Sequence, residues 1–195
     1  MLGLSLRTWR ALRRIKQAHA AQLLGVSQTT VSRWENGQIP LTPDEAAQLR
    51  LLMSARLDSA ADRVLARLVS QSAAPVHLIC DLTHRLLAAS PKRVARFKVP
   101  ASQLMGVSLW RYASQDIVAM ESQLADRGWF SPSPPPIEFH TCAHDSAGLT
   151  ILDSHMRWAR FQLSDGSFVR LVETDEAQGV GVHPPKFRGA QPAPA

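Results

Sequence analysis

Apolar residues recur at spacings of three and four through the first seventy positions of the chain, and no stretch there alternates as a β-strand would. This pattern predicts helices over residues 4–13, 17–24, 27–35 and 43–53. The fourth has Pro43 in its first turn, followed by two acids that suit the positive end of a helix. The N-terminal part is therefore expected to be all helix.

Residues 56–69 continue the helical spacing as a separate segment. The apolar positions follow one another at steps of four, three and four, which are heptad spacings over only two heptads: Leu57, Ala61, Val64 and Leu68. Two interpretations stay open. The segment is either a linker helix that packs on its own domain or a helix that pairs with a second copy of the chain.

Short apolar runs of strand length replace the helical pattern after Pro75. The predicted order is β-β-α-β-β-β, because a helical stretch over about 100–127 lies between the second and third strands. The last two strands flank Asp165-Gly166, a hairpin signal because such a turn needs a positive φ. The five strands are expected over residues 76–82, 85–89, 137–142, 155–163 and 167–173.

These changes of pattern divide the chain into four parts. A helical domain is expected over 1–56, a linker or dimerisation helix over 57–74 and an α/β domain over 75–176. Residues 177–195 contain four prolines and three glycines without an apolar period, so this part is expected to be a disordered tail.

The positive charge of the chain is concentrated at its N-terminal end. Of the net charge of +6, residues 1–56 carry +5, with eight Lys or Arg against three acids. Such a local excess favours a polyanion, of which nucleic acid is the commonest. The sequence has no apolar run of about 18 residues to span a membrane and no signal-peptide core, so a cytoplasmic protein is expected. Cys80 and Cys142 are expected to be thiols in packing positions.

The stretch from Ala21 to Trp34 has the residue types that a helix-turn-helix unit needs. Two helices that cross closely require a small residue inside the first, a glycine at the turn and apolar residues on the inner face of the second. Ala21, Gly25, Val31 and Trp34 occupy these places, and Ser27 can cap the second helix.

With Val31 pointing inward, the outer face of the second helix displays three polar side chains and one basic side chain: Gln28, Thr29, Ser32 and Arg33. Gln pairs with adenine, Arg pairs with guanine and the Thr methyl meets the thymine methyl in a major groove wide enough for a helix. The alternative is a helical hairpin with a solvated polar face. The basic excess favours double-stranded DNA as the partner.

Residues 5–54 resemble the Cro/repressor-like (XRE-type) helix-turn-helix regulators, through Ala-Gln-Leu-Leu-Gly-Val-Ser at 21–27 and Thr-Val-Ser-Arg-Trp-Glu-Asn-Gly at 30–37. The resemblance implies phosphate contacts from Gln17 and Asn36, and base reading by Gln28, Thr29 and Arg33. It also implies that Glu35 pairs with Arg10. Two residues depart from the family pattern: Arg14 stands where glycine is usual, and Ala20 replaces a larger apolar residue.

The strand order of residues 75–176 resembles the PAS family, as does Gln-Leu-Met-Gly-Val-Ser-Leu-Trp at 103–110. The resemblance implies an antiparallel sheet with helices on one face, dimer formation and, in many members, a small ligand between sheet and helices. The flavin-photochemistry motif of light-sensing members is absent, so blue-light sensing is not expected. No cofactor is assigned, and an unknown small ligand stays open. A filled core without a ligand is the alternative. Candidate pocket residues are Ile79, Leu87, Leu104, Trp110, Phe139, Trp158 and Phe168.

Two clusters of polar residues suggest further chemistry. His140, Cys142 and His144 alternate and would share one face of a strand, but a fourth zinc ligand is not identified, so no metal site is expected. The arginines of the last hairpin either hold an acidic ligand or are solvated charges: Arg157, Arg160 and Arg170.

The function that these features favour is a sequence-specific DNA-binding transcriptional regulator, a dimer whose DNA binding is controlled by the PAS-like domain. The alternative is an antitoxin or adaptor whose C-terminal domain binds a protein partner, while its N-terminal domain autoregulates the operon. No nucleophile, phosphate loop or pair of acids indicates an enzyme.

Overall fold

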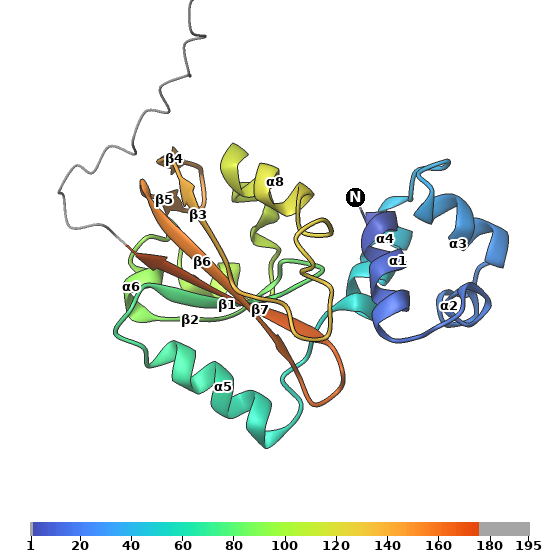
Figure 1. Cartoon of the computed structure of the whole chain (residues 1–195), viewed down its shortest axis with the longest axis horizontal. Coiled ribbons are helices and arrows are strands. Elements are labelled where there is room, and N and C mark those ends of the chain that lie inside the picture. The colour runs from blue at the N-terminus through green and yellow to red at the C-terminus, as the bar shows by residue number, and fades with distance from the viewer. Residues whose placement is uncertain (1, 176–195) are drawn as a thin grey trace, which may run out of the picture.

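The computed structural model describes residues 2–175, so the predicted disordered tail over 177–195 lies outside the described residues. The N-terminal part consists of four helices, which lie together at one side of the sheet domain (Figure 1). They are close to the predicted ranges: α1 (Leu2–Leu12), α2 (Gln17–Leu24), α3 (Gln28–Glu35) and α4 (Pro43–Met53).

The ends of these helices follow from local sequence. Gly25 ends α2 with a φ of 66°, and its neighbour Val26 donates its N–H to the carbonyl of Ala21, which closes the helix. Thr42 and Glu45 form a reciprocal capping box at the start of α4. The short connections follow from these stop and start signals.

The helical domain has its own apolar core, in which α1 packs closely against α3. A Cβ at Gly3 would lie 1.9 Å from the carbonyl oxygen of Trp34, so only glycine allows this approach. The core is made of Leu6, Trp9, Ala20, Ala21, Val31, Trp34, Leu49 and Met53.

The second domain is built on a five-stranded antiparallel sheet in the order β2-β1-β7-β6-β3. The predicted strands are therefore confirmed, and the predicted turn at Gly166 has a φ of 78°. Two short strands, β4 (His144–Asp145) and β5 (Thr150–Ile151), form a separate ribbon that the sequence pattern did not predict. The sheet strands are β1 (Val76–Cys80), β2 (Leu86–Ala89), β3 (Ile137–Thr141), β6 (Ser154–Gln162) and β7 (Phe168–Asp175).

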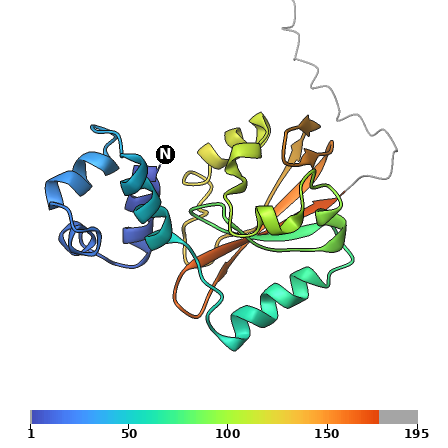
Figure 2. The ribbon, with the colours of Figure 1, turned by 180° about the vertical axis from the view of Figure 1, so that it is seen from behind.

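Short helices between β2 and β3 cover one face of the sheet, as predicted (Figures 1 and 2). Leu104, Met120 and Leu124 from this segment belong to one core with Trp158 and Val172 of the sheet. The predicted helical stretch over about 100–127 consists of three short helices, and a one-turn helix before it was not predicted. The segments are α6 (Pro91–Val94), α7 (Ala101–Leu104), the 3₁₀ helix η1 (Leu109–Tyr112) and α8 (Gln115–Ser122).

The opposite face of the sheet is covered by α5 (Ala60–Ser70), so helices lie on both faces (Figure 1). Leu65 and Val69 of α5 pack in a second core with Leu78 and Val169 of the sheet. The outer side of the same helix leaves Leu68 61% exposed. This helix therefore packs on the sheet domain and still presents an apolar outer side.

The two domains touch at the end of β1 and its turn. Leu82 packs against the core of the helical domain, and the N–H of Ala55 donates to Cys80 Sγ at 3.3 Å. The hydroxyls of Ser54 and Thr83 lie 3.5 Å apart. One strand thus links the sheet to the end of α4.

None of the helices within residues 2–175 combines the length and the apolar character that a membrane-spanning helix needs.

Candidate functional site

Helix α3 presents one polar face to solvent and buries the other. Val31 and Trp34 are 0% and 3% exposed, while Gln28, Thr29 and Arg33 are exposed. Ser32 lies on the same side and is half-buried. The predicted base-reading residues therefore share one accessible surface, which we call the α3 face.

The residues that the sequence placed at the helix crossing hold this face in position. Ala21 is buried, and Gly25 has the left-handed conformation that the turn requires. Ser27 Oγ accepts the N–H of Thr30 at 3.0 Å and so caps α3. The start of α3 is fixed directly beside the exposed side chains.

Glu35 ties three helices together behind the α3 face. Its carboxylate accepts hydrogen bonds from Arg10 at 2.6 and 2.7 Å and from Gln17 Nε2 at 2.9 Å. Burial alone raises the pKa of Glu35, but the bonds from Arg10 and Gln17 outweigh it and lower the pKa. The Arg10–Glu35 pair that the resemblance implied is present, and Gln17 already uses one amide N–H inside the protein.

The N-terminus of α2 has no side-chain cap and is surrounded by basic side chains. Its capping position, Lys16, makes no side-chain cap, and Lys16, Arg14 and His19 are exposed around a shallow hollow. Arg14 has a φ of 54°, in the left-handed region that favours glycine. Asn36, the other predicted phosphate contact, is exposed at the end of α3.

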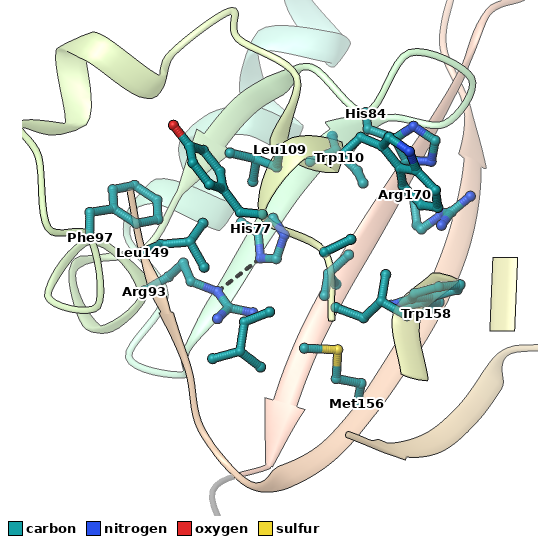
Figure 3. Close-up of a pocket in the computed structure, with 16 residues that line it drawn as sticks. His77, His84, Arg93, Phe97, Leu109, Trp110, Leu149, Met156, Trp158 and Arg170 are labelled. Carbon is teal, nitrogen blue, oxygen red and sulfur yellow. Dashed lines mark hydrogen bonds between the residues drawn. The ribbon is translucent and has the colours of Figure 1, made fainter. Parts of the chain in front are cut away.

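A pocket lies between the sheet and its short helices (Figure 3). Three of the predicted pocket residues line it: Ile79, Trp110 and Trp158. Two others fill the core nearby, since Leu104 is fully buried and Phe139 packs edge-on against Trp158 with ring centroids 4.7 Å apart.

The remaining two predicted pocket residues lie elsewhere. Phe168 lies at the hairpin end of β7 under Arg160, whose guanidinium carbon is 3.6 Å from the ring centroid. Leu87 packs in the core beneath α5 on the opposite face. The sequence pattern indicates which residues are apolar but not how far along a strand the pocket extends.

A buried charge cluster lies next to the pocket and includes two of the hairpin arginines, Arg160 and Arg170. The sequence had suggested that these arginines either hold an acidic ligand or are solvated, and the structure corrects this. Arg160 and Arg170 are buried, with side chains only 1% and 2% exposed, and both donate to Asp81 at 2.8 Å. Arg170 also donates to Glu121 at 2.6 Å. Trp129 Nε1 donates to Asp81 at 3.0 Å. The two arginines are therefore structural ion-pair partners.

Glu121 connects this cluster to the pocket wall. Its carboxylate lies 3.1 Å from His84 Nε2. Burial raises the pKa of Glu121, but the charge of Arg170 and the bond with His84 lower it to about 2. Sequence reasoning missed both acids of the cluster. The signal that could have indicated a buried acid is the position of Asp81 directly after an apolar strand.

The other polar residues singled out in the sequence are not brought together. His140 pairs with Asp153 at 2.8 Å, and Cys142 is exposed, with its backbone N–H donating to Asp116. Within residues 2–175, no group of three or more His, Cys, Asp or Glu can hold a metal ion. Arg157 lies on the exposed side of the sheet near Glu138, at 3.5 Å.

Residues 1–63 match the family model described as a helix-turn-helix domain. The chain is similar to the solved PAS domain of an HTR-like protein from Haloarcula marismortui, at 17% identity and a TM-score of 0.42, over 59% of this chain and 96% of that chain. It is similar to the PAS domain of BvgS from Bordetella pertussis at 14% identity and a TM-score of 0.38, over 58% and 82% of the two chains.

A third solved structure, an RNA-binding light-oxygen-voltage receptor, matches at 10% identity and a TM-score of 0.41, over 85% of this chain and 56% of that chain. No curated protein matches the chain. The match to the helix-turn-helix domain thus covers α1 to α4, and the second domain contains the antiparallel strands that the sequence predicted.

Proposed function

We propose that the protein is a sequence-specific DNA-binding transcriptional regulator that binds operator DNA as a dimer, with α3 in the major groove. The observation that carries the proposal is the α3 face, where polar side chains project from a helix fixed by Gly25, Ser27 and Glu35. A helix that is fixed at both ends and exposes a polar face suits insertion into a groove.

The α3 face has two long side chains that can hydrogen-bond to base edges and two short side chains. Arg33 suits the O6 and N7 acceptors of guanine, and Gln28 suits adenine. Thr29 offers a methyl group for thymine, and Ser32 offers a hydroxyl. Together these groups account for sequence preference at several neighbouring base pairs.

Phosphate contacts on either side would position the helix. We assign one to Asn36 and one to Gln17, whose second amide N–H and backbone N–H remain for a phosphate after the bond to Glu35. The uncapped N-terminus of α2 adds the partial positive charge of a helix end beside Lys16. These contacts would supply affinity without base preference.

A dimer follows from the small reach of one recognition helix, which covers too few base pairs to be specific alone. The apolar outer side of α5, with Val64 and Leu68 exposed, is our candidate for the surface that pairs two copies. The contact of the β1 turn with the helical domain would let the PAS-like domain control the spacing of the two recognition helices.

Footprinting on an operator selected by the full chain tests this proposal. Two protected half-sites with two-fold symmetry are expected, separated centre to centre by about 34 Å, one turn of DNA, or a multiple of it. A single, unrepeated half-site would contradict the dimer. An absence of protected sequence on any fragment would contradict DNA recognition itself.

A further inference from the structure

The turn between β1 and β2, which we call the joint turn (residues 81–84), reaches into the helical domain. Leu82 packs against the apolar core of that domain, whose other members among the described residues all lie within 2–53. The hydroxyl of Thr83 lies 3.5 Å from that of Ser54, and both residues are buried. The sheet domain therefore completes the core of the helical domain beside the end of α4.

The other two side chains of the joint turn contact the sheet domain. Asp81 accepts a hydrogen bond from Arg170 at 2.8 Å, and Arg170 donates to Glu121 at 2.6 Å. The same Glu121 carboxylate lies 3.1 Å from His84 Nε2, and the His84 ring stacks near Trp110 with centroids 4.8 Å apart (Figure 3). One ion network therefore holds both ends of the turn.

The backbone of the joint turn is held in an unfavourable conformation. His84 has a φ of 57°, in the left-handed region that a residue with a Cβ adopts only at a cost in free energy. Its N–H donates to the carbonyl of Cys80 at 2.8 Å, and its carbonyl accepts the N–H of Leu109 at 2.9 Å. The Ser108 hydroxyl donates to the carbonyl of Thr83 at 2.8 Å. Such a conformation persists because surrounding contacts fix it, so the loss of a contact would let the turn relax.

A second contact between the domains lies at the β6–β7 hairpin. Arg13, directly after α1, lies 3.5 Å from Asp165 of the hairpin, and the two side chains are 31% and 29% exposed. An ion pair that is this accessible contributes little, because water solvates and screens both charges. The apolar contact of Leu82 and the buried network behind it therefore dominate the coupling between the domains.

We propose that the joint turn is a regulatory element with two positions. While Glu121 and Asp81 hold it through Arg170, Leu82 stays on the helical domain and fixes the orientation of α3 relative to the sheet. When the network loses a charge, the strained turn relaxes and Leu82 withdraws. As control of operator binding, this inference deepens the proposed function and rests on it, whereas the coupling between the domains does not.

Amide hydrogen exchange of the full chain without DNA, followed by NMR, tests the coupling. The probe is the N–H of Ala55, which donates to Cys80 Sγ at 3.3 Å directly before the joint turn. Glu121→Gln should speed exchange at Ala55 about tenfold or more. The matched control Glu138→Gln, at an exposed acid of β3, should leave this exchange unchanged. Unchanged exchange at Ala55 in Glu121→Gln would overturn the proposal.

Two further variants separate release of the joint turn from general destabilisation. Ile137→Ala removes buried volume on β3, three strands away from β1, and should speed exchange in the sheet but change it at Ala55 by less than about twofold. Leu82→Ala should speed exchange at Ala55 by itself, and adding Glu121→Gln should then contribute less than about twofold, because both changes act through one contact. Equal acceleration at Ala55 by Ile137→Ala and Glu121→Gln, or full additivity in the double variant, would contradict the joint turn as the route.

The regulatory role is tested separately on a selected operator. Glu121→Gln should weaken operator binding about fivefold or more with the wild-type base preference, because the α3 face is unaltered while its placement is no longer fixed. Unchanged operator affinity alongside faster exchange would overturn the control of DNA binding. A wild type that binds no operator would refute the proposed function, and the exchange measurements would still decide the coupling.

Discussion

Replacing Asp81 by Asn should strongly destabilise the sheet domain. Asp81 is completely buried and accepts hydrogen bonds from Trp129, Arg160 and Arg170. The substitution keeps the size of the side chain but removes the one charge that faces both guanidinium groups. Arg170 retains Glu121 at 2.6 Å, whereas Arg160 loses its carboxylate partner.

The magnitude follows from the asymmetry of buried ion pairs. Breaking such a pair by removing one partner costs about 3–5 kcal/mol, because a buried charge remains without compensation. Since Asn still accepts one hydrogen bond and Arg170 keeps a second acid, we expect the low end, about 3 kcal/mol. A domain with a free energy of unfolding of about 5–15 kcal/mol would remain folded at 25 °C.

Urea denaturation followed by tryptophan fluorescence measures this loss, since Trp129 and Trp158 lie in the affected core. Asp81→Asn should shift the midpoint to lower urea with an unchanged slope. Asp153→Asn is the matched control, because the same change at an exposed partner of His140 should cost about 0–1 kcal/mol. Equal midpoints for the two variants would refute the structural role assigned to the buried cluster.

Three further predictions concern pH, backbone conformation and domain function. Burial and the charge of Arg170 leave the folded pKa of Glu121 depressed to about 2, so its contribution to stability is fully present well above the unfolded value and is lost progressively between about pH 5 and pH 1. Acid titration should therefore destabilise the wild type more steeply than Glu121→Gln, by about 3 kcal/mol over the whole range. Gly25 and Arg14 both have a positive φ, which is unfavourable for a residue with a Cβ. Gly25→Ala should therefore lower the free energy of unfolding by about 1 kcal/mol, whereas Arg14→Gly should not lower it, and calorimetric melting of the two variants compares them. A fragment ending at Arg56 should keep its base preference but bind operator far more weakly in gel-shift titration, since linked half-sites gain from effective concentration; equal affinity at equal salt would exclude control through dimerisation.

The helical domain could be predicted closely because its signals are local. Gly25, Ser27 and Pro43 stop and start helices by their own backbone and side-chain chemistry, and the spacing of Val31 and Trp34 fixes which face of α3 is exposed. The strands after Pro75 could also be predicted, because short apolar runs and the Asp165-Gly166 turn are short-range features.

The pocket and the charge cluster depend on residues far apart in sequence, which periodicity does not relate. Asp81 meets Arg160 and Arg170 only after β1, β6 and β7 pair, so the arginines looked like solvated charges. Phe168 is apolar like a pocket residue, yet register places it at the hairpin end under Arg160. Helix α5 was open to two interpretations, packing on its own domain or pairing with a second copy, because heptad spacing alone does not indicate what the apolar side of the helix contacts.

Selection of DNA from a random duplex pool, with the full chain and its Arg33→Ala variant, tests the central claim most directly. The wild type should enrich a two-fold symmetric sequence, and the variant should lose about 1–3 kcal/mol of discrimination at one symmetric base pair of each half-site while keeping the others. Arg157→Ala, at an exposed arginine of the sheet, should select the wild-type sequence. Enrichment of no consensus by the wild type, or the same consensus from Arg33→Ala, would contradict base reading by α3.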